Sequence, residues 1–153
     1  MKLFIGRHGE ASFNAPSDRE RPLTPNGISI TQKLRDDHLA ELAQAQLIWS
    51  SDLRRAQETA TIYAEKLNLN IDTKNFLSPD CEADRVLRKL QALDADSCVL
   101  IISHQPLVGE LVSLLCEGSI YMAHPYTTSE IVVVECELAE KGLGSIKEQF
   151  LPG

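Results

Sequence analysis

The sequence predicts an α/β fold, a three-layer sandwich with a mainly parallel central sheet, an antiparallel C-terminal strand and helices on both faces. Two observations support this class. Short apolar runs alternate with longer segments of helical periodicity, which is typical of a mainly parallel sheet. No repeat, low-complexity tract or linker interrupts this alternation, and 153 residues fit one compact core. We therefore expect residues 1–153 to form a single domain.

The N-terminal third is expected to form a strand, a helix and a second strand. The apolar run Leu3-Phe4-Ile5 predicts a buried strand at about residues 2–6, and the polar residues 10–21 predict the loop that follows it. Thr24-Pro25 marks the start of a helix, because a threonine side chain caps the first turn and that turn does not need the N–H that proline lacks. This helix is expected to end between residues 38 and 42. The apolar residues 47–49 then form the second buried strand.

The middle third predicts two helices around a short strand. Residues 53–67 have apolar positions at helical spacing, and their apolar stripe begins at Ala56. Residues 71–73 are few and partly polar, which is typical of a strand at a sheet edge. Residues 83–93 again have a helical apolar stripe.

The C-terminal third predicts a buried strand, a helix and a final strand pair. Residues 98–102 are apolar on every position, as expected for a parallel strand that is covered on both faces. Pro106 is expected to open a helix that runs to about Cys116. The segments 131–138 and 145–150 are joined by a short connection and are expected to pair antiparallel.

Composition limits the classes of partner. The net charge of −7 argues against nucleic acid or an anionic membrane as the main partner. The N-terminus lacks the design of a signal peptide, and the longest apolar runs are far too short to span a bilayer. The four cysteines form no C-x-x-C pair, which favours free thiols in a reducing compartment. We expect a cytoplasmic protein.

Two histidines follow the ends of two predicted buried strands. The tripeptide Arg7-His8-Gly9 follows the first strand, and Ser103-His104 follows the strand at residues 98–102. Alone, the first is also compatible with a surface turn and the second with a strand cap. In an open α/β sheet, ligands bind in the crevice beyond the carboxyl ends of the strands. If the two strands are neighbours, both imidazoles project into the same crevice.

Arginines precede or begin two of the predicted helices. Arg54 and Arg55 lie in the first turn of the helix at residues 53–67, where cations oppose the helix dipole unless an anion is bound there. We expect Arg55 to face inward, because it lies next to the apolar stripe. Arg21 lies just before the helix at Thr24-Pro25, where a solvated loop position is the alternative interpretation.

These segments, in this order and spacing, resemble the histidine phosphatase superfamily, whose fold is phosphoglycerate mutase-like. The matching residues are Arg7-His8-Gly9, Arg21-Pro22-Leu23-Thr24 with Gly27, Ser51-x-Leu53-x-Arg55-Ala56 with Thr59-Ala60, and Ser103-His104. The small size, the continuation Gln105-Pro106-Leu107-Val108-Gly109 and the late Thr127-Thr128-Ser129 resemble the SixA-type phosphohistidine phosphatases within this superfamily.

The resemblance implies a chemistry for each matching residue. His8 corresponds to the nucleophile that accepts a phosphoryl group, while Arg7, Arg55 and His104 surround the phosphoryl oxygens. The further phosphate or substrate contacts that we expect are Arg21, Gly9 and Ser51. Neutral imidazole is largely unprotonated at pH 7, and forked guanidinium groups suit phosphate, so the chemistry agrees with the residue types. We expect no metal and no cofactor.

The leaving group separates the substrate classes. A phosphate ester needs a proton from a nearby acid, which larger relatives carry in an inserted helical segment. Here the corresponding stretch, residues 77–84, is short. Its carboxylates Asp80 and Glu82 are candidate acids, although a turn and a helix cap explain them as well. Phosphohistidine has an imidazole leaving group that departs readily once protonated, so it makes less demand on a dedicated acid.

The leading hypothesis is a protein phosphohistidine phosphatase acting on a histidine-phosphotransfer domain or a phosphocarrier protein of a signalling relay. The first alternative is a small-molecule phosphomonoesterase of the same superfamily. The second is a non-catalytic phosphate-binding module, which is disfavoured because His8, Arg7, Arg55 and His104 are all present.

Overall fold

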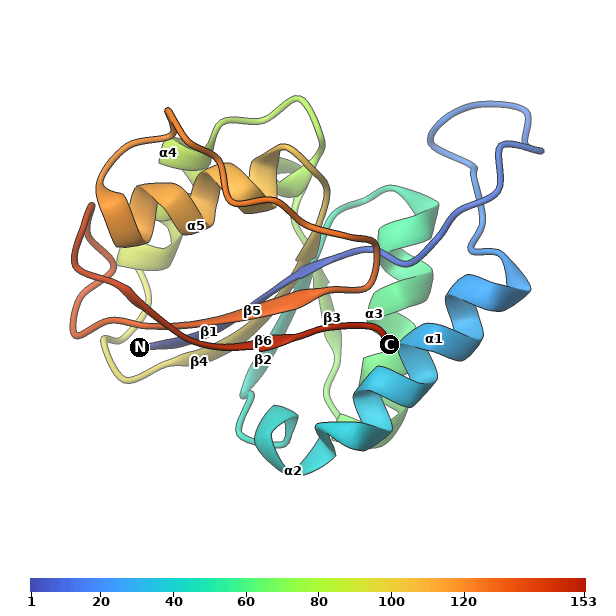
Figure 1. Cartoon of the computed structure of the whole chain (residues 1–153), viewed down its shortest axis with the longest axis horizontal. Helices are drawn as coiled ribbons and strands as arrows, with labels where there is room; N and C mark the ends of the chain where they lie inside the picture. Colours follow the sequence, from blue (N-terminus) through green and yellow to red (C-terminus); the bar gives the residue numbers. More distant parts are fainter.

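The computed structural model describes residues 1–153 and contains one six-stranded sheet between two layers of helices (Figure 1). The strands are β1 (Lys2–Arg7), β2 (Leu47–Ser50), β3 (Ile71–Thr73), β4 (Cys98–Ser103), β5 (Ile131–Glu135) and β6 (Ser145–Phe150). They lie in the order β3-β2-β4-β1-β5-β6. The first four strands are parallel, whereas β5 pairs antiparallel with both β1 and β6. The predicted mixed sheet is confirmed, with β3 at one edge.

The helices cover both faces of this sheet. They are α1 (Pro25–Asp37), α2 (Leu39–Leu42), α3 (Arg54–Leu67), α4 (Ala83–Gln91) and α5 (Leu107–Glu117), together with a 3-10 turn, η1 (Asn75–Leu77). Figure 1 shows α1 and α3 on one side of the sheet and α4 and α5 on the other. The three predicted layers are therefore present.

Alternation along β1 divides the apolar core between the two helical layers, because successive strand residues point to opposite faces. Leu3 and Ile5 pack in a cluster with the apolar faces of α4 and α5. Phe4 packs in a second cluster that includes Tyr63 of α3 and Leu34 of α1. All three β1 side chains are fully buried, so the strand that leads to the site is fixed from both sides.

Helix α1 begins where the sequence predicts. The Thr24 hydroxyl oxygen accepts a hydrogen bond from the Gly27 N–H at 2.9 Å, and Pro25 is the first helical residue. The helix ends at Asp37, and the predicted extension to residue 42 is instead the separate short helix α2.

The predicted strand at residues 131–138 was too long. Strand β5 ends at Glu135, which pairs with Lys2 of β1, and only the bonds between Cys136 and Met1 follow. The apolar residue Leu138 lies beyond the end of its partner strand and is exposed. None of the helices has both the length and the apolar character to cross a bilayer.

The register brings the ends of three neighbouring strands to the same level. Arg7 at the end of β1 pairs with Ser103 at the end of β4, and Ser50 at the end of β2 pairs with Ile102. The residues that follow these strands therefore meet at one edge of the sheet. This is the edge at which the sequence places the candidate site.

Gly27 allows the first turn of α1 to approach the loop after β1. A Cβ atom at this position would collide with the backbone carbonyl oxygen of Glu10.

We expect Gly27→Ala to lower the free energy of unfolding by about 1–3 kcal/mol, because the backbone has to move to relieve the collision. Urea unfolding measures the change. Ser29→Ala, at an exposed position of the same helix, is the control and should stay within about 0.5 kcal/mol of the wild type. Equal stability of the two variants would contradict the conclusion that Gly27 is needed for this close approach.

Candidate active site

The two predicted histidines lie side by side beyond the ends of β1 and β4. Their ring centroids are 5.0 Å apart, and both side chains are buried. Backbone bonds hold the strand ends together, since the N–H of His8 donates to the Ser103 carbonyl and the N–H of Ser51 donates to the Ile102 carbonyl, both at 3.0 Å. The sheet therefore places His8 and His104 in the same crevice, as the sequence predicts.

A backbone carbonyl fixes the tautomer of His8. Its Nδ1 lies 2.7 Å from the Gly9 carbonyl oxygen, which can only accept, so Nδ1 carries the proton and Nε2 keeps the lone pair. Gly9 is itself anchored, because its N–H donates to the Thr59 hydroxyl oxygen at 3.0 Å. The Thr59 hydroxyl in turn donates to the Arg55 carbonyl at 2.7 Å. Helix α3 thus holds the imidazole of His8 in one orientation.

Ser51 holds His104 through Nε2 of the ring, whereas His8 is held through Nδ1. The Nε2 of His104 lies 2.7 Å from the Ser51 Oγ, which also accepts the Leu53 N–H at 3.1 Å. The Ser51 hydroxyl proton can then be donated to Nε2, which leaves the proton of the neutral ring on Nδ1. That Nδ1 is buried and has no hydrogen-bond partner in the protein. Ser51 therefore positions His104 instead of facing the cavity itself.

Two arginines add further unpartnered donors. Arg7 donates from one terminal nitrogen to the Tyr126 carbonyl at 3.1 Å, and Arg55 donates to the Asp18 carbonyl at 2.8 Å. The Nε of each guanidinium is buried without a partner, like Nδ1 of His104. Buried polar groups are seldom unpaired, and three such donors on residues that line one cavity indicate a site for an anion.

Arg21 lies at the rim of the same cavity. Its guanidinium donates to the Ser12 carbonyl at 3.0 Å and to the Ala11 carbonyl at 3.3 Å. It also stacks on the ring of Phe13, 3.9 Å from the ring centroid. Phe13 is 85% exposed, so the rim carries an apolar surface that faces solvent.

The cavity has a volume of about 360 Å³ and includes most of the predicted site residues. It is lined by Arg7, His8, Glu10, Ala11, Phe13, Arg21, Arg55, Pro79, His104, Gln105 and Thr128. Of the predicted contacts, Gly9 and Ser51 support the lining residues from behind. No three His, Cys, Asp or Glu side chains gather in a way that could hold a metal ion.

Burial and positive charge keep both imidazoles neutral. Burial lowers the pKa of His8 from 6.5 to about 4, against the opposing hydrogen bond to Gly9, and the positive charges of Arg55, Arg7 and Arg21 lower it further. Burial also lowers the pKa of His104, to about 3, with His8 as the next cause. At neutral pH, Nε2 of His8 therefore has a free lone pair.

The two candidate acids lie outside this cavity. Asp80 and Glu82 are exposed, and neither is among the lining residues. The carboxylate that does line the cavity belongs to Glu10, whose oxygens accept from the Thr24 hydroxyl at 2.7 Å and from the Asn26 amide at 3.4 Å. It thus ties the loop after β1 to the first turn of α1.

No pattern in the sequence points to Asp18, whereas Thr59 and Thr128 lie within segments that resemble the family and had no predicted contact. Asp18 and Thr59 act on the site through their contacts with Arg55. No spacing in the sequence links Asp18 to the end of β1, and the resemblance includes Thr128 without placing it at the cavity. Only the folded chain brings these loops together.

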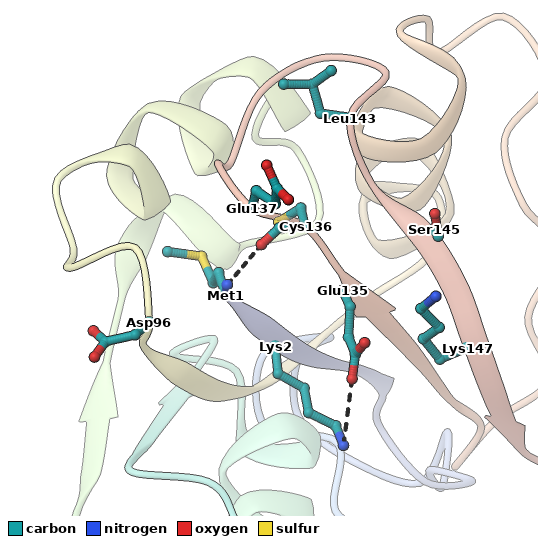
Figure 2. A pocket seen from close by; sticks show the side chains of 9 residues that line it. All are labelled: Met1, Lys2, Asp96, Glu135, Cys136, Glu137, Leu143, Ser145 and Lys147. Carbon is teal, nitrogen blue, oxygen red and sulfur yellow. Dashed lines mark hydrogen bonds and ion pairs between the residues drawn. The ribbon is translucent and has the colours of Figure 1, made fainter.

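A second, larger hollow of about 760 Å³ lies at the opposite end of the strands (Figure 2). Its charges are mixed, and Lys2 pairs with Glu135 at 3.8 Å. The N-terminal amine donates to the Cys136 carbonyl at 2.6 Å, and burial raises the pKa of the Cys136 thiol. This hollow lacks the convergent, unpaired donors of the histidine cavity, so it is not the candidate site.

The depressed pKa of His8 predicts that the protein loses stability in mild acid. An unfolded histidine takes up a proton near pH 6.5, whereas folded His8 resists protonation until about pH 4. The unfolded state therefore binds more protons in this window, and its stabilisation lowers the free energy of unfolding as the pH falls. Between pH 7 and pH 5 the contribution of His8 is about 2 kcal/mol.

Urea unfolding of the wild type and His8→Asn at the two pH values measures this contribution. The variant should lose less stability than the wild type over the same interval. An equal loss in both proteins would show that His8 titrates normally.

Comparison with known proteins identifies the family. The model of the histidine phosphatase superfamily (branch 1) matches residues 3–78. The chain is 35% identical to the phosphohistidine phosphatase SixA of Escherichia coli (strain K12) over 156 residues, which covers 99% of this chain and 94% of the relative. It is 36% identical to a SixA homolog of Haemophilus influenzae over 126 residues, covering 75% and 77% of the two chains.

A solved structure shares the whole fold. The protein histidine phosphatase SixA, complexed with tungstate, superposes with a TM-score of 0.89 and 34% identity, covering 99% of this chain and 97% of the other. The relative from Escherichia coli and the solved structure are matched over nearly their full length, and the agreement covers all the strands that build the histidine cavity. The chain therefore belongs to the histidine phosphatase superfamily and, within it, to the SixA family of phosphohistidine phosphatases.

Proposed function

We propose that this protein is a phosphohistidine phosphatase, a hydrolase that removes phosphate from a histidine of a phosphotransfer domain or phosphocarrier protein through a phospho-His8 intermediate. One observation carries the proposal. The lone pair of a neutral His8 lies in a cavity with three buried donors that have no partner, on Arg7, Arg55 and His104. A phosphoryl group supplies both the electrophile and the missing acceptors.

The first half of the reaction transfers the phosphoryl group to His8. Nε2 attacks phosphorus in line, a new N–P bond forms, and the N–P bond of the substrate breaks. The substrate imidazole leaves as a neutral ring, because the electron pair of the broken bond stays on the departing nitrogen and the other ring nitrogen carries a proton taken from solvent. Arg7, Arg55 and His104 donate to the phosphoryl oxygens as charge redistributes, and Arg21 adds positive charge from the rim.

The second half restores the enzyme. Water attacks phosphorus, the N–P bond to His8 breaks, and inorganic phosphate is released. The Gly9 carbonyl holds the Nδ1 proton throughout, so the departing electron pair returns to Nε2 and recreates the nucleophile. The guanidinium groups of Arg7, Arg55 and Arg21 supply the positive charge for this reaction, and the neutral ring of His104 adds a hydrogen-bond donor.

The proposal agrees with what a relative binds. The SixA structure with 34% identity contains tungstate, a tetrahedral oxyanion of the shape and charge of phosphate. In this chain, the unpartnered Nε atoms of Arg7 and Arg55 and Nδ1 of His104 are the donors that we expect to contact such an ion.

A phosphorylated protein fits the site better than a small phosphate ester. The carboxylates Asp80 and Glu82 lie outside the cavity, and the exposed Phe13 gives the rim an apolar surface suited to a protein partner. The net charge of −7 disfavours nucleic acid and anionic membranes as partners. We infer a role in cytoplasmic signal transduction, with a phosphohistidine protein as the partner.

The intermediate can be trapped directly. A wild-type sample mixed rapidly with a labelled phosphohistidine protein and quenched without acid should carry label on His8. His8→Asn should carry none and should lose turnover by about 10³-fold or more, because the nucleophile is absent. The control is His38→Gln, whose ring stacks on Phe150 outside the cavity and which should leave labelling and turnover unchanged. Label on any other residue would refute the proposed nucleophile.

The double variant Asp80→Asn with Glu82→Gln tests the phosphomonoesterase alternative. We expect phosphohistidine turnover to stay within about twofold of the wild type, because neither carboxylate reaches the cavity. Turnover is measured with a phosphohistidine protein and with simple alkyl phosphates side by side. The alternative function predicts a preference for the esters and a loss of ester turnover of about 10²–10⁴-fold in the variant.

A further inference from the structure

We propose that Asp18 is a built-in counter-anion, which competes with the phosphoryl group for Arg21 and Arg55 and thereby weakens the hold of the site on product phosphate. This inference rests on the proposed function, since it assumes that the cavity binds phosphate. It assigns a regulatory effect on affinity to a residue that lies outside every matched motif.

The Asp18 carboxylate bridges two of the cationic side chains. One oxygen lies 3.2 Å from a terminal nitrogen of Arg21, and the other lies 3.3 Å from a terminal nitrogen of Arg55. Both arginines line the cavity, whereas Asp18 does not. The carboxylate thus occupies donors that a bound phosphate would otherwise attract.

Neither arginine depends on this carboxylate for its position. Arg21 donates to the backbone carbonyls of Ser12 and Ala11, and Arg55 donates to the backbone carbonyl of Asp18 at 2.8 Å. These backbone contacts remain when the Asp18 side chain is changed. The carboxylate therefore contributes mainly its negative charge.

The Asp18 carboxylate can also give way to a ligand. Its side chain is 63% exposed, while the Arg55 side chain is only 7% exposed. When phosphate arrives, Asp18 can turn toward water with little loss of packing, and Arg55 stays in place. The Asp18 carboxylate and the bound phosphate then repel each other only across partly solvated space.

The position of Asp18 beside the two arginines favours the release of product phosphate. A cavity lined by Arg7, Arg21 and Arg55 and containing unpaired donors binds inorganic phosphate as well as substrate. Affinity shared by substrate and product does not accelerate the chemical step, and it slows product release. A nearby carboxylate lowers affinity for phosphate without removing any group that contacts the reacting atoms.

The test uses Asp18→Asn, which keeps the shape of the side chain and removes its charge. Phosphate affinity is measured by isothermal titration calorimetry with inorganic phosphate and by product inhibition of turnover. We expect Asp18→Asn to bind phosphate about 3- to 10-fold more tightly than the wild type, with the difference shrinking as salt is added. Asp18→Glu keeps the charge and should stay near wild type.

The matched control is Asp37→Asn, which removes the same charge from an exposed carboxylate on α1 that pairs with Lys33 outside the cavity. It should leave phosphate affinity unchanged. Weaker or unaltered phosphate binding in folded Asp18→Asn would overturn the counter-anion role, since a merely structural role predicts a loss. A wild type that neither binds phosphate nor turns over phosphohistidine would instead overturn the proposed function, and this inference with it.

Discussion

Electrostatic repulsion is the constraint that dominates this molecule. Three arginines and two imidazoles line one cavity, and the only carboxylate among the lining residues is that of Glu10, which is bound to Thr24 and Asn26. Cations that line the same cavity repel one another, and the repulsion grows as water is excluded. The structure must therefore hold these groups together at a cost, which a bound anion offsets.

The fold meets this cost with backbone contacts. Each cationic group is held by carbonyl oxygens that belong to rigid elements or to loops tied to them, such as Tyr126 for Arg7 and Asp18 for Arg55. Carbonyl dipoles stabilise a guanidinium without neutralising it, so the site keeps its positive potential. Strands β1 and β4, which lead to the cavity, are buried on both faces, so the charged groups at their ends cannot move apart.

The same constraint supplies the reactivity of His8. Burial and the surrounding cations would make a protonated imidazole unfavourable, so the ring stays neutral and keeps its lone pair. One physical cause thus gives both a nucleophile and an anion site. Asp18, at the exposed edge, is the place where this potential can be adjusted without disturbing either.

The sequence by itself determined the layers of the fold, the order of its elements and the four principal residues of the cavity. The local pattern of apolar side chains was sufficient to locate every strand, and the Thr24-Pro25 pair located the cap of α1. His8 and His104 could be paired because parallel strands end at one edge of a sheet, which is a general property of the class. The length of β5 could not be predicted, because it depends on where its partner strand begins.

Only the tertiary structure decided which further residues act on the site. Asp18 and Thr128 lie in loops whose paths follow no periodic pattern, and contacts across long stretches of chain bring them to the cavity. The tertiary structure also placed Asp80 and Glu82 outside it and fixed the tautomer of His8 through the Gly9 carbonyl. The physical reason is that strand order and burial follow from residue type, whereas the course of a loop depends on hydrogen bonds that form only in the assembled fold.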